Sequence, residues 1–386
     1  MELNNMENTI IYLIRHAETV DENGIRNTDE TMQEINEKEI LSVEGERAAK
    51  ELSENDEDFV IMKSDNLLPT YHFAHAVDDY LMHTTHIVRG EEWLSSVPKH
   101  VELFNTFGFP LPKYIHTPLI IKKEGNSIRK ISKRKDPEAT MSYYSENGYP
   151  KEAVIESLMT IINSNYEEWH SQNPDKSYLE FTYNPEKMSS SGGLYDLEKL
   201  NSLSKDIISH KKAIDVCNES YEWACEYSPS LKEMIDNDRE YYTNILNIER
   251  EQEKPRKDIV YYSMIEDLIW YMYDDKFNSR EKEYEWKNIT DLNEIKNILN
   301  TYFDKYYDEN DDKETWFNKV RSLCDELGYA SNIKEYQQNP DAYKGNVADI
   351  STVIRVAITS KSNTPDLYEI MKLLGKERIK TRINML

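Results

Sequence analysis

Short apolar runs and longer amphipathic stretches alternate between residues 58 and 121. Runs that are rich in β-branched and apolar residues predict buried strands. Three such runs follow one another: DFVIMKS (58–64), THIVRG (85–90) and YIHTPLII (114–121). The intervening stretches have the length of helices, and strands separated by helices predict a parallel sheet with right-handed crossovers. Ligands of such sheets bind at the carboxyl ends of the strands.

Two helices are expected between these strands. Phe73, Val77 and Leu81 are four residues apart, which places them on one face of a helix over 68–82. A second helix is expected over 95–107, where a proline near the start suits the first turn.

The chain from residue 146 to its end carries only helical patterns. Representative stretches are KEAVIESLMTIIN, DLEKLNSLSKDIIS, SMIEDLIWYMYDD, LNEIKNILNTYFDKYY and TWFNKVRSLCDEL. Residues 1–54 differ again, because TIIYLIRH predicts a strand and SVEGERAAKELSE predicts a helix. The predicted fold class is therefore α/β followed by all-α, in a chain of 386 residues that is long enough for two or three domains.

Charge is distributed unevenly along the chain. The formal net charge is -25, which argues against nucleic-acid binding over the whole surface. Asp21–Asp58 holds fourteen acidic residues against four basic ones, whereas Pro110–Thr140 holds eight basic residues against three acidic ones. A basic patch in an acidic chain predicts a localised anion site.

Composition also bears on location and redox state. Cys217, Cys225 and Cys324 form no CxxC pair, so we expect reduced thiols. No apolar run of roughly 18 residues occurs, and MELNNMENTI does not resemble a secretory signal. We expect a cytoplasmic monomer that does not contact a membrane.

The string KISKR, Lys130 to Arg134, carries the clearest candidate chemistry. It follows a predicted strand and a Gly-Asn turn. Lys130 and Lys133 are three residues apart on a loop and can close on a polyphosphate, where their charge stabilises a leaving pyrophosphate. Without its context, the same string could be a solvated basic turn.

The surroundings of this loop make it specific. The segment LPTYHFAHAVDDYLMHTTHIVRGEEWLSSVPKHVELFNTFGFPLPKYIHTPLII precedes it, and SNTPDLYEIMKLLGKERI lies near the C-terminus. From Asn55 onward, over more than 80% of the chain, the sequence resembles the bacterial glutamyl-tRNA synthetase family. The resemblance implies a truncated Rossmann-like catalytic half over 55–145 and helical stem-contact and anticodon-binding domains over 146–386.

Family roles can be assigned position by position. Lys130 and Lys133 match the lysines of the KMSKS loop, which hold the phosphates of ATP. Tyr71 and Arg89 match the residues that contact the glutamate substrate, and a guanidinium suits a carboxylate. The residues implied in ATP binding are Glu92, Trp93, Lys130, Ser132, Lys133 and Arg134. The implied ligands are ATP with Mg²⁺, glutamate and a glutamate-accepting tRNA.

The first half of the family's catalytic domain is not recognisable in this sequence. No HxGH string, which would match the family's HIGH motif, occurs in the chain. Instead, residues 1–54 resemble the start of the histidine phosphatase (phosphoglycerate mutase-like) family, in which Arg15, His16 and Glu18 match an RHxET motif. The motifs that complete a phosphatase do not follow, so we interpret these three residues as vestigial.

Four histidines raise the question of zinc: His72, His75, His83 and His86. Each pair is three residues apart, a spacing that can place two ligands on one helix face. The second pair falls between a helix and a strand without a nearby cysteine, so no protein-bound metal is expected.

Three functions are therefore compared. The first is ATP-dependent charging of tRNA with glutamate, in which the unrecognised HIGH half puts catalysis in doubt. The second is a non-catalytic paralogue that binds tRNA or a protein partner. The third, the least favoured, is a phosphatase using His16.

Overall fold

The computed structural model describes residues 59–63, 68–174, 176–188 and 192–386. Two compact units divide the chain: one extends to Lys130 and includes Met159–Tyr195, and the other contains Ile131–Leu158 and Asp196–Leu386. Arg15, His16 and Glu18 lie outside the described residues.

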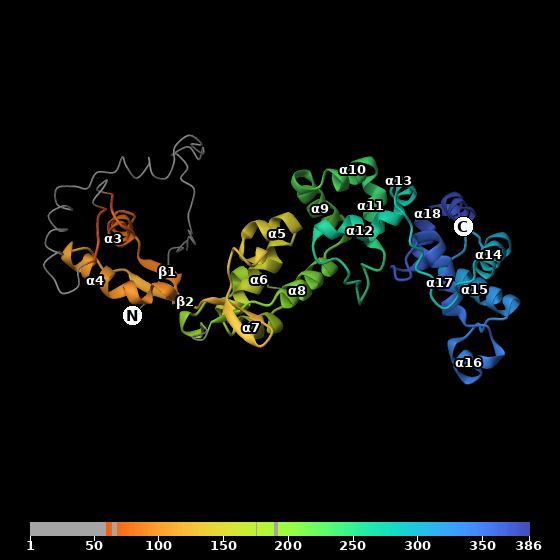
Figure 1. Ribbon diagram of the computed structural model, residues 1–386, viewed down its shortest axis with the longest axis horizontal. Helices are drawn as coiled ribbons and strands as arrows, with labels where there is room; N and C mark the ends of the chain where they lie inside the picture. Colours follow the sequence, from red (N-terminus) through yellow and green to blue (C-terminus); the bar gives the residue numbers. More distant parts are fainter. Residues whose placement is uncertain (1–58, 64–67, 175, 189–191) are drawn as a thin grey trace. The chain divides into compact units, whose positions relative to one another are not determined.

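Two helices and two parallel strands form the first part of the first unit (Figure 1). In chain order the elements are α3 (Tyr71–Leu81), β1 (His86–Gly90), the 3-10 helix η1 (Glu91–Ser96), α4 (Val97–Thr106) and β2 (Lys113–Thr117). Strands β1 and β2 are parallel, with Arg89 opposite His116. The predicted parallel pairing is confirmed for these two strands.

Helices α3 and α4 pack through a small aromatic core. Phe73 and Ala76 of α3 bury against Leu103 and Phe104 of α4. Phe73 is buried as predicted, whereas Leu81, assigned to the same face, is 66% exposed. Leu81 ends α3, two turns beyond Phe73, and is not part of this core.

Two strand predictions in the first unit were wrong. Residues 59–63 form only an isolated bridge between Met62 and Pro69, because a proline has no N–H to extend a ladder. The run 114–121 is divided at Pro118 into β2 and β3 (Ile120–Glu124). The two parts belong to different sheets.

The second sheet contains β3, β4 (Ser127–Lys130) and β5 (Gly193–Leu194). Strands β3 and β4 are antiparallel and joined by a two-residue turn. Gly125 takes φ +62 at the first position of this turn, a conformation that glycine adopts without strain. Strand β5 is parallel to β3 and is a small exception to the all-helical pattern predicted after residue 146.

Short helices complete the described part of the first unit. They are α7 (Tyr166–Gln172), η3 (Tyr178–Glu180) and η4 (Pro185–Lys187). Helix α6 (Lys151–Ile162) contributes residues to both units.

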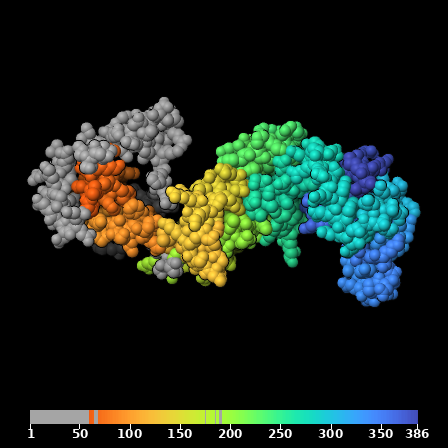
Figure 2. Space-filling model, viewed as in Figure 1, coloured from red at the N-terminus to blue at the C-terminus, as the bar shows by residue number. Residues whose placement is uncertain are grey.

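Helices dominate the described part of the second unit, as predicted, and Figure 2 shows the surface of these residues in yellow to blue. They are η2 (Pro137–Ala139), α5 (Met141–Asn147), α8 (Leu197–His210), α9 (Ala213–Tyr227), α10 (Pro229–Asn237), α11 (Arg239–Asn247), η5 (Tyr262–Met264), α12 (Ile265–Ile269), η6 (Trp270–Met272), α13 (Asp274–Ser279), α14 (Leu292–Thr301), the π-helical turn η7 (Tyr302–Tyr306), α15 (Lys313–Leu327), α16 (Ile333–Gln338), η8 (Pro340–Ala342), α17 (Val347–Thr359) and α18 (Leu367–Asn384).

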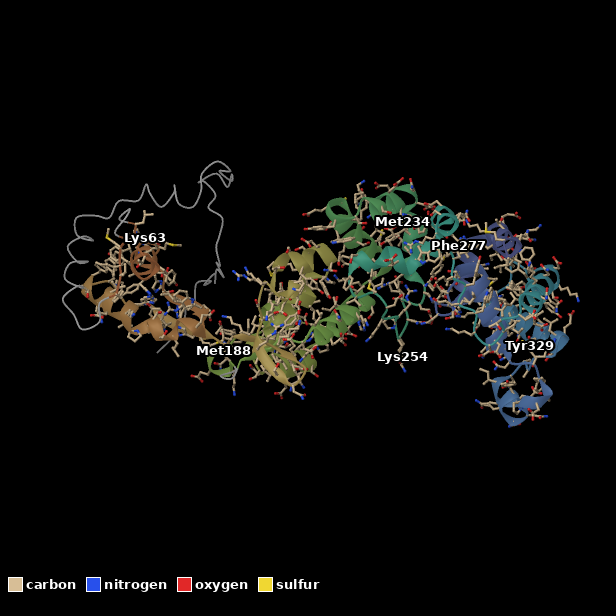
Figure 3. All side chains as sticks on the ribbon, in the orientation of Figure 1. Lys63, Met188, Met234, Lys254, Phe277 and Tyr329 are labelled. Atoms are coloured by element: carbon tan, nitrogen blue, oxygen red, sulfur yellow. The ribbon has the colours of Figure 1, made fainter. Side chains whose placement is uncertain are left out.

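One continuous core joins most of the helices of the second unit. Met234, Phe277 and Tyr329, all labelled in Figure 3, belong to this core although they come from distant parts of the chain. The thiols of Cys217 and Cys324 are buried in it, and the thiol of Cys225 is exposed. All three are free.

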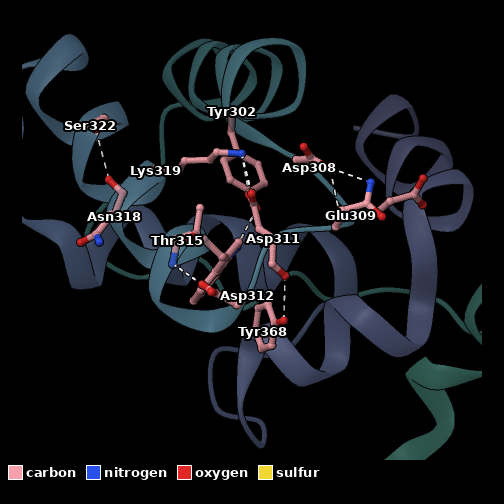
Figure 4. Close-up of polar contacts among 12 residues, drawn as sticks. Tyr302, Asp308, Glu309, Asp311, Asp312, Thr315, Asn318, Lys319, Ser322 and Tyr368 are labelled. Carbon is pink, nitrogen blue, oxygen red and sulfur yellow. Dashed lines mark hydrogen bonds and ion pairs between the residues drawn. The ribbon is translucent and has the colours of Figure 1, made fainter.

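The turn that precedes α15 is held by polar contacts (Figure 4). Asp312 caps the helix by accepting from the backbone N–H of Thr315 at 2.7 Å. Lys319 donates to both carboxylate oxygens of Asp311 at 2.7 Å, and the Tyr368 hydroxyl donates to the Asp311 carbonyl at 2.8 Å. These bonds fix the connection between η7 and α15.

Candidate functional site

Arg89 is the centre of a polar cluster in the first unit. It lies one residue before the end of β1, opposite His116 of β2, so both residues lie near the carboxyl ends of two parallel strands. This is the edge at which such sheets bind ligands. Helices α3 and α4 add Tyr71, His75 and His100 to the same cluster.

Three acceptors hold the Arg89 guanidinium. Its Nε–H donates to Nε2 of His116 at 3.2 Å, and a terminal N–H donates to Nδ1 of His100 at 2.9 Å. The other terminal nitrogen donates to the carbonyl of Trp93 at 3.3 Å. The guanidinium carbon also lies 4.9 Å from the centre of the Tyr114 ring, where a cation–π contact is favourable.

The imidazole of His100 is fully buried between α3 and Arg89. Its Nε2 lies 2.9 Å from Nδ1 of His72, and its ring centre lies 4.4 Å from that of His75. Burial, and then the nearby charges of His75 and Arg89, lower the pKa of His100 to about 3. His100 is therefore neutral at pH 7 and can accept a hydrogen bond from a cation.

Three other rings near Arg89, those of His116, His72 and Tyr114, have pKa values shifted toward the neutral form. Burial is the first cause that lowers the pKa of His116, and Arg89 is the second. Burial and then Lys99 lower the pKa of His72. Burial raises the pKa of Tyr114 to about 12, so its hydroxyl keeps its proton.

His75 connects this cluster to an acidic side chain. Its Nδ1 lies 2.5 Å from a carboxylate oxygen of Asp79, one helical turn further along α3. Its Nε2 lies 3.2 Å from the Tyr114 hydroxyl. Asp79 therefore orients His75.

Tyr71 and Trp93 form the exposed side of the cluster. Their ring centres are 4.5 Å apart, and the Tyr71 ring stacks on His75 at 5.8 Å. Tyr71 is 48% exposed although it contacts four other rings. An aromatic side chain held in place but open to solvent is suited to contact a ligand.

Lys130 ends β4 in the same unit. Its ammonium group lies 3.2 Å from a carboxylate oxygen of Glu92, which belongs to η1 next to Trp93. Both side chains are partly exposed, so water screens this ion pair and it contributes little to stability. The lysine can exchange such a partner for a phosphate.

The rest of the KISKR string forms a tight turn in the second unit. The buried Asp136 accepts from the backbone N–H of Ser132 at 2.8 Å, and the backbone N–H of Asp136 donates to the Ser132 carbonyl at 2.8 Å. Lys133 and Arg134 lie within this closed turn and are exposed. Asp136 thus fixes a turn that presents three exposed basic residues, Lys133, Arg134 and Lys135.

The structure brings together five of the residues that the sequence predicted. Tyr71, Arg89, Glu92, Trp93 and Lys130 all lie in the first unit, connected by the contacts above. Ser132, Lys133 and Arg134 belong to the second unit. The roles assigned to these residues remain predictions.

Sequence reasoning missed the residues that surround Arg89. His72 and His75 were weighed only as metal ligands, and His100, Tyr114 and His116 were not considered. The spacing of His72 and His75 on α3 was the one sequence feature that pointed to a cluster of histidines here. Within the ranges that the structure describes, no group of three or more His, Cys, Asp or Glu side chains is arranged to hold a metal ion.

Comparison with known families gives two matches that together cover most of the chain. Residues 27–192 match the catalytic domain of class I tRNA synthetases for glutamate and glutamine (E and Q). Residues 224–386 match an anticodon binding domain. The order of a catalytic domain and a helical domain agrees with the fold described above.

Individual relatives agree with the family matches. A glutamate–tRNA ligase of Clostridium perfringens strain 13 is 44% identical over 348 residues, which are 90% of this chain and 63% of the relative. One from Acetivibrio thermocellus is 45% identical over 332 residues, or 86% of this chain and 60% of the relative. The crystal structure of a glutamate tRNA ligase from Elizabethkingia meningosepticum, in complex with its amino acid, has a TM-score of 0.59 at 20% identity, and covers 86% of this chain and 62% of that one.

The chain is similar to the class I tRNA synthetases of the glutamate and glutamine type over residues 27–192. Within that class, its relatives are bacterial glutamate–tRNA ligases, and it spans about 60% of the length of these two relatives. The catalytic match begins at residue 27, inside the segment 1–54, so the predicted likeness of that segment to a histidine phosphatase gains no support. Among the described residues, none of the helices is both long and apolar enough to cross a bilayer.

Proposed function

We propose that this chain activates glutamate with ATP and transfers it to tRNA, as a protein of the glutamate–tRNA ligase type. The observation that carries the proposal is the geometry of Arg89, a half-buried cation held by uncharged acceptors beside an exposed tyrosine. The names of its relatives favour the same reaction.

The glutamate site consists of Arg89 and Tyr71. Arg89 has no acidic partner among the described residues, so its charge is available to a carboxylate. Tyr71 lies beside Trp93, and the carbonyl of Trp93 accepts a hydrogen bond from Arg89. In this site the exposed ring of Tyr71 covers the bound glutamate. A carboxylate is preferred over an uncharged amide because a guanidinium binds it through charge-assisted hydrogen bonds.

Glu92, Trp93 and Lys130 of the first unit are proposed to bind ATP, and Ser132, Lys133 and Arg134 of the second unit are proposed to do so through their resemblance to the family's KMSKS loop. Glu92 and Trp93 lie next to one another on η1, and Lys130 contacts Glu92. Lysines on this loop stabilise the negative charge that develops on the phosphates as pyrophosphate leaves. ATP is a substrate in this scheme, and Mg²⁺ arrives with the nucleotide.

The tRNA contacts are assigned to the second unit. Residues 224–386 match an anticodon binding domain. Positive side chains at a few positions are needed for phosphate contacts, because the chain as a whole has a net charge of -25.

Glutamate-dependent exchange between ATP and pyrophosphate, measured with tRNA present, tests the proposal. We expect exchange by the wild-type chain and a loss of about a hundredfold in Lys133→Ala, since one electrostatic contact to a transition state contributes about 3 kcal/mol. Lys123→Ala is the matched control: it removes an exposed lysine of β3 outside the proposed site and should retain full exchange. Background exchange by a folded wild-type chain would contradict the proposal.

A second function is favoured by one observation. No HxGH string occurs anywhere in the 386 residues, and the family uses that motif to contact ATP. A chain that retained the anticodon-type helices but no activation chemistry would be a non-catalytic tRNA-binding protein. Background exchange together with intact binding of tRNA, measured by filter retention, is the result that this alternative predicts.

A further inference from the structure

The hydrogen bonds of Arg89 leave a defined number of donors unused. A guanidinium has five N–H groups and no acceptor. Three of them donate to His116, His100 and the Trp93 carbonyl. One N–H therefore remains on each terminal nitrogen. These two donors are the number that a carboxylate needs to bind through both of its oxygens.

The same bonds determine the tautomers of three histidines. Arg89 can only donate, so Nδ1 of His100 must be the bare nitrogen, and Nε2 of this neutral ring carries the hydrogen. The Nε2–H of His100 then donates to Nδ1 of His72, which places the hydrogen of His72 on Nε2. His116 accepts through Nε2 and carries its hydrogen on Nδ1.

We propose that His100 and His116 are positioning residues, which hold Arg89 through bare imidazole nitrogens so that its two remaining N–H groups are presented to the substrate carboxylate. This inference rests on the proposed glutamate site. It adds that the arginine is oriented by two specific histidine tautomers and that His100 acts on the substrate only through Arg89.

Uncharged acceptors serve this purpose better than a carboxylate. An acidic partner would orient a guanidinium equally well, but it would also neutralise the charge and compete with the substrate. Two imidazoles, a backbone carbonyl and the face of Tyr114 orient Arg89 while leaving its full charge for a ligand. The depressed pKa values of His100 and His116 agree with this arrangement.

The tautomer of His100 can be observed directly. In a chain labelled with ¹⁵N-histidine, the signals that disappear in His100→Gln identify this ring. We expect one of its nitrogens, Nδ1, to resonate as an unprotonated imidazole nitrogen and Nε2 as a protonated one, at pH 7 and without ligand. A doubly protonated ring, or a hydrogen on Nδ1, would overturn the inference.

Two substitutions separate positioning from mere packing. His100→Leu keeps the bulk but removes both hydrogen bonds, and it should weaken glutamate binding about tenfold in calorimetry, the value of one hydrogen bond to a charged group. His100→Gln has a carbonyl to accept from Arg89 and an amide to donate to His72, so it should bind within about threefold of the wild type. Equal losses in both variants, or no loss in His100→Leu, would overturn the inference.

Controls keep the result interpretable. His86→Leu makes the same change at an exposed histidine of β1. Among the described residues this histidine contacts only Thr85 by hydrogen bond, so the variant should bind glutamate like the wild type.

If His100→Leu does not fold, His116→Leu replaces it in the binding experiment. We then expect His116→Leu to weaken glutamate binding and His116→Gln to restore it. If the wild-type chain binds no glutamate, the proposed function fails, and the ¹⁵N spectrum then decides whether His100 holds Arg89.

Discussion

Replacing Arg89 by leucine should weaken glutamate binding by at least about a hundredfold. Each hydrogen bond to a charged group contributes about 1.5–3 kcal/mol, so two of them correspond to about 3 kcal/mol or more, and every 1.4 kcal/mol is tenfold in affinity. The guanidinium is oriented by partners within the protein itself, which lowers the conformational entropy that it loses when a ligand binds. Isothermal titration of L-glutamate into both chains measures the difference.

Two further variants define what Arg89 contributes. Arg89→Lys keeps the charge but not the planar guanidinium. Its affinity for glutamate should lie between those of Arg89→Leu and the wild type. Arg129→Leu removes an arginine of β4 that pairs with Glu124, and it should leave the affinity unchanged. Similar affinities of Arg89→Leu and the wild type would show that glutamate binds elsewhere or not at all.

Replacing Arg382 by leucine should destabilise the second unit by about 3 kcal/mol. Arg382 is 2% exposed and donates to the carbonyls of Tyr271 at 2.7 Å and Ile358 at 2.6 Å. It also donates to Asp274 at 2.8 Å and lies 4.0 Å from the centre of the Phe277 ring. Its removal leaves two buried carbonyls without a donor, and each unsatisfied group costs about 1–3 kcal/mol.

Arg378 provides the matched control on the same helix. It contacts the same Asp274, the Tyr241 hydroxyl and the Met272 carbonyl, but its side chain is 40% exposed, so Arg378→Leu should lower the free energy of unfolding less than Arg382→Leu does. Urea denaturation followed by far-ultraviolet circular dichroism reports on the helices of this unit. If both variants shift the midpoint of urea denaturation equally, the hydrogen bonds from Arg382 to the carbonyls of Tyr271 and Ile358 do not contribute the stability expected of them.

Much of the secondary structure could be predicted from local pattern. The helix expected over 68–82 extends over Tyr71–Leu81, and THIVRG forms β1. The helix expected over 95–107 is preceded by the 3-10 turn η1 and begins at Val97. The stretch SMIEDLIWYMYDD is broken into four short helices, and the buried Trp270, Tyr271 and Met272 show that it is covered on several sides, so it has no single apolar face.

The arrangement around Arg89 could not be predicted in the same way. The sequence identified Arg89 and Tyr71 only through resemblance to a family. The pairing of Arg89 with His116 depends on the register of two strands that are 27 residues apart in the chain. The contact with His100 depends on how α4 packs on α3, which is decided by Phe73, Leu103 and their neighbours. Long-range register and packing have no signature in a single sequence.

A crystal structure of the chain grown with L-glutamate tests the glutamate site most directly. We expect a carboxylate of the ligand within about 3 Å of both terminal nitrogens of Arg89, with the Tyr71 ring against it and the bonds to His100 and His116 retained. A structure in which glutamate occupies another place, while Arg89 turns away from His100 to pair with an acidic side chain, would contradict the proposed site and the positioning role together.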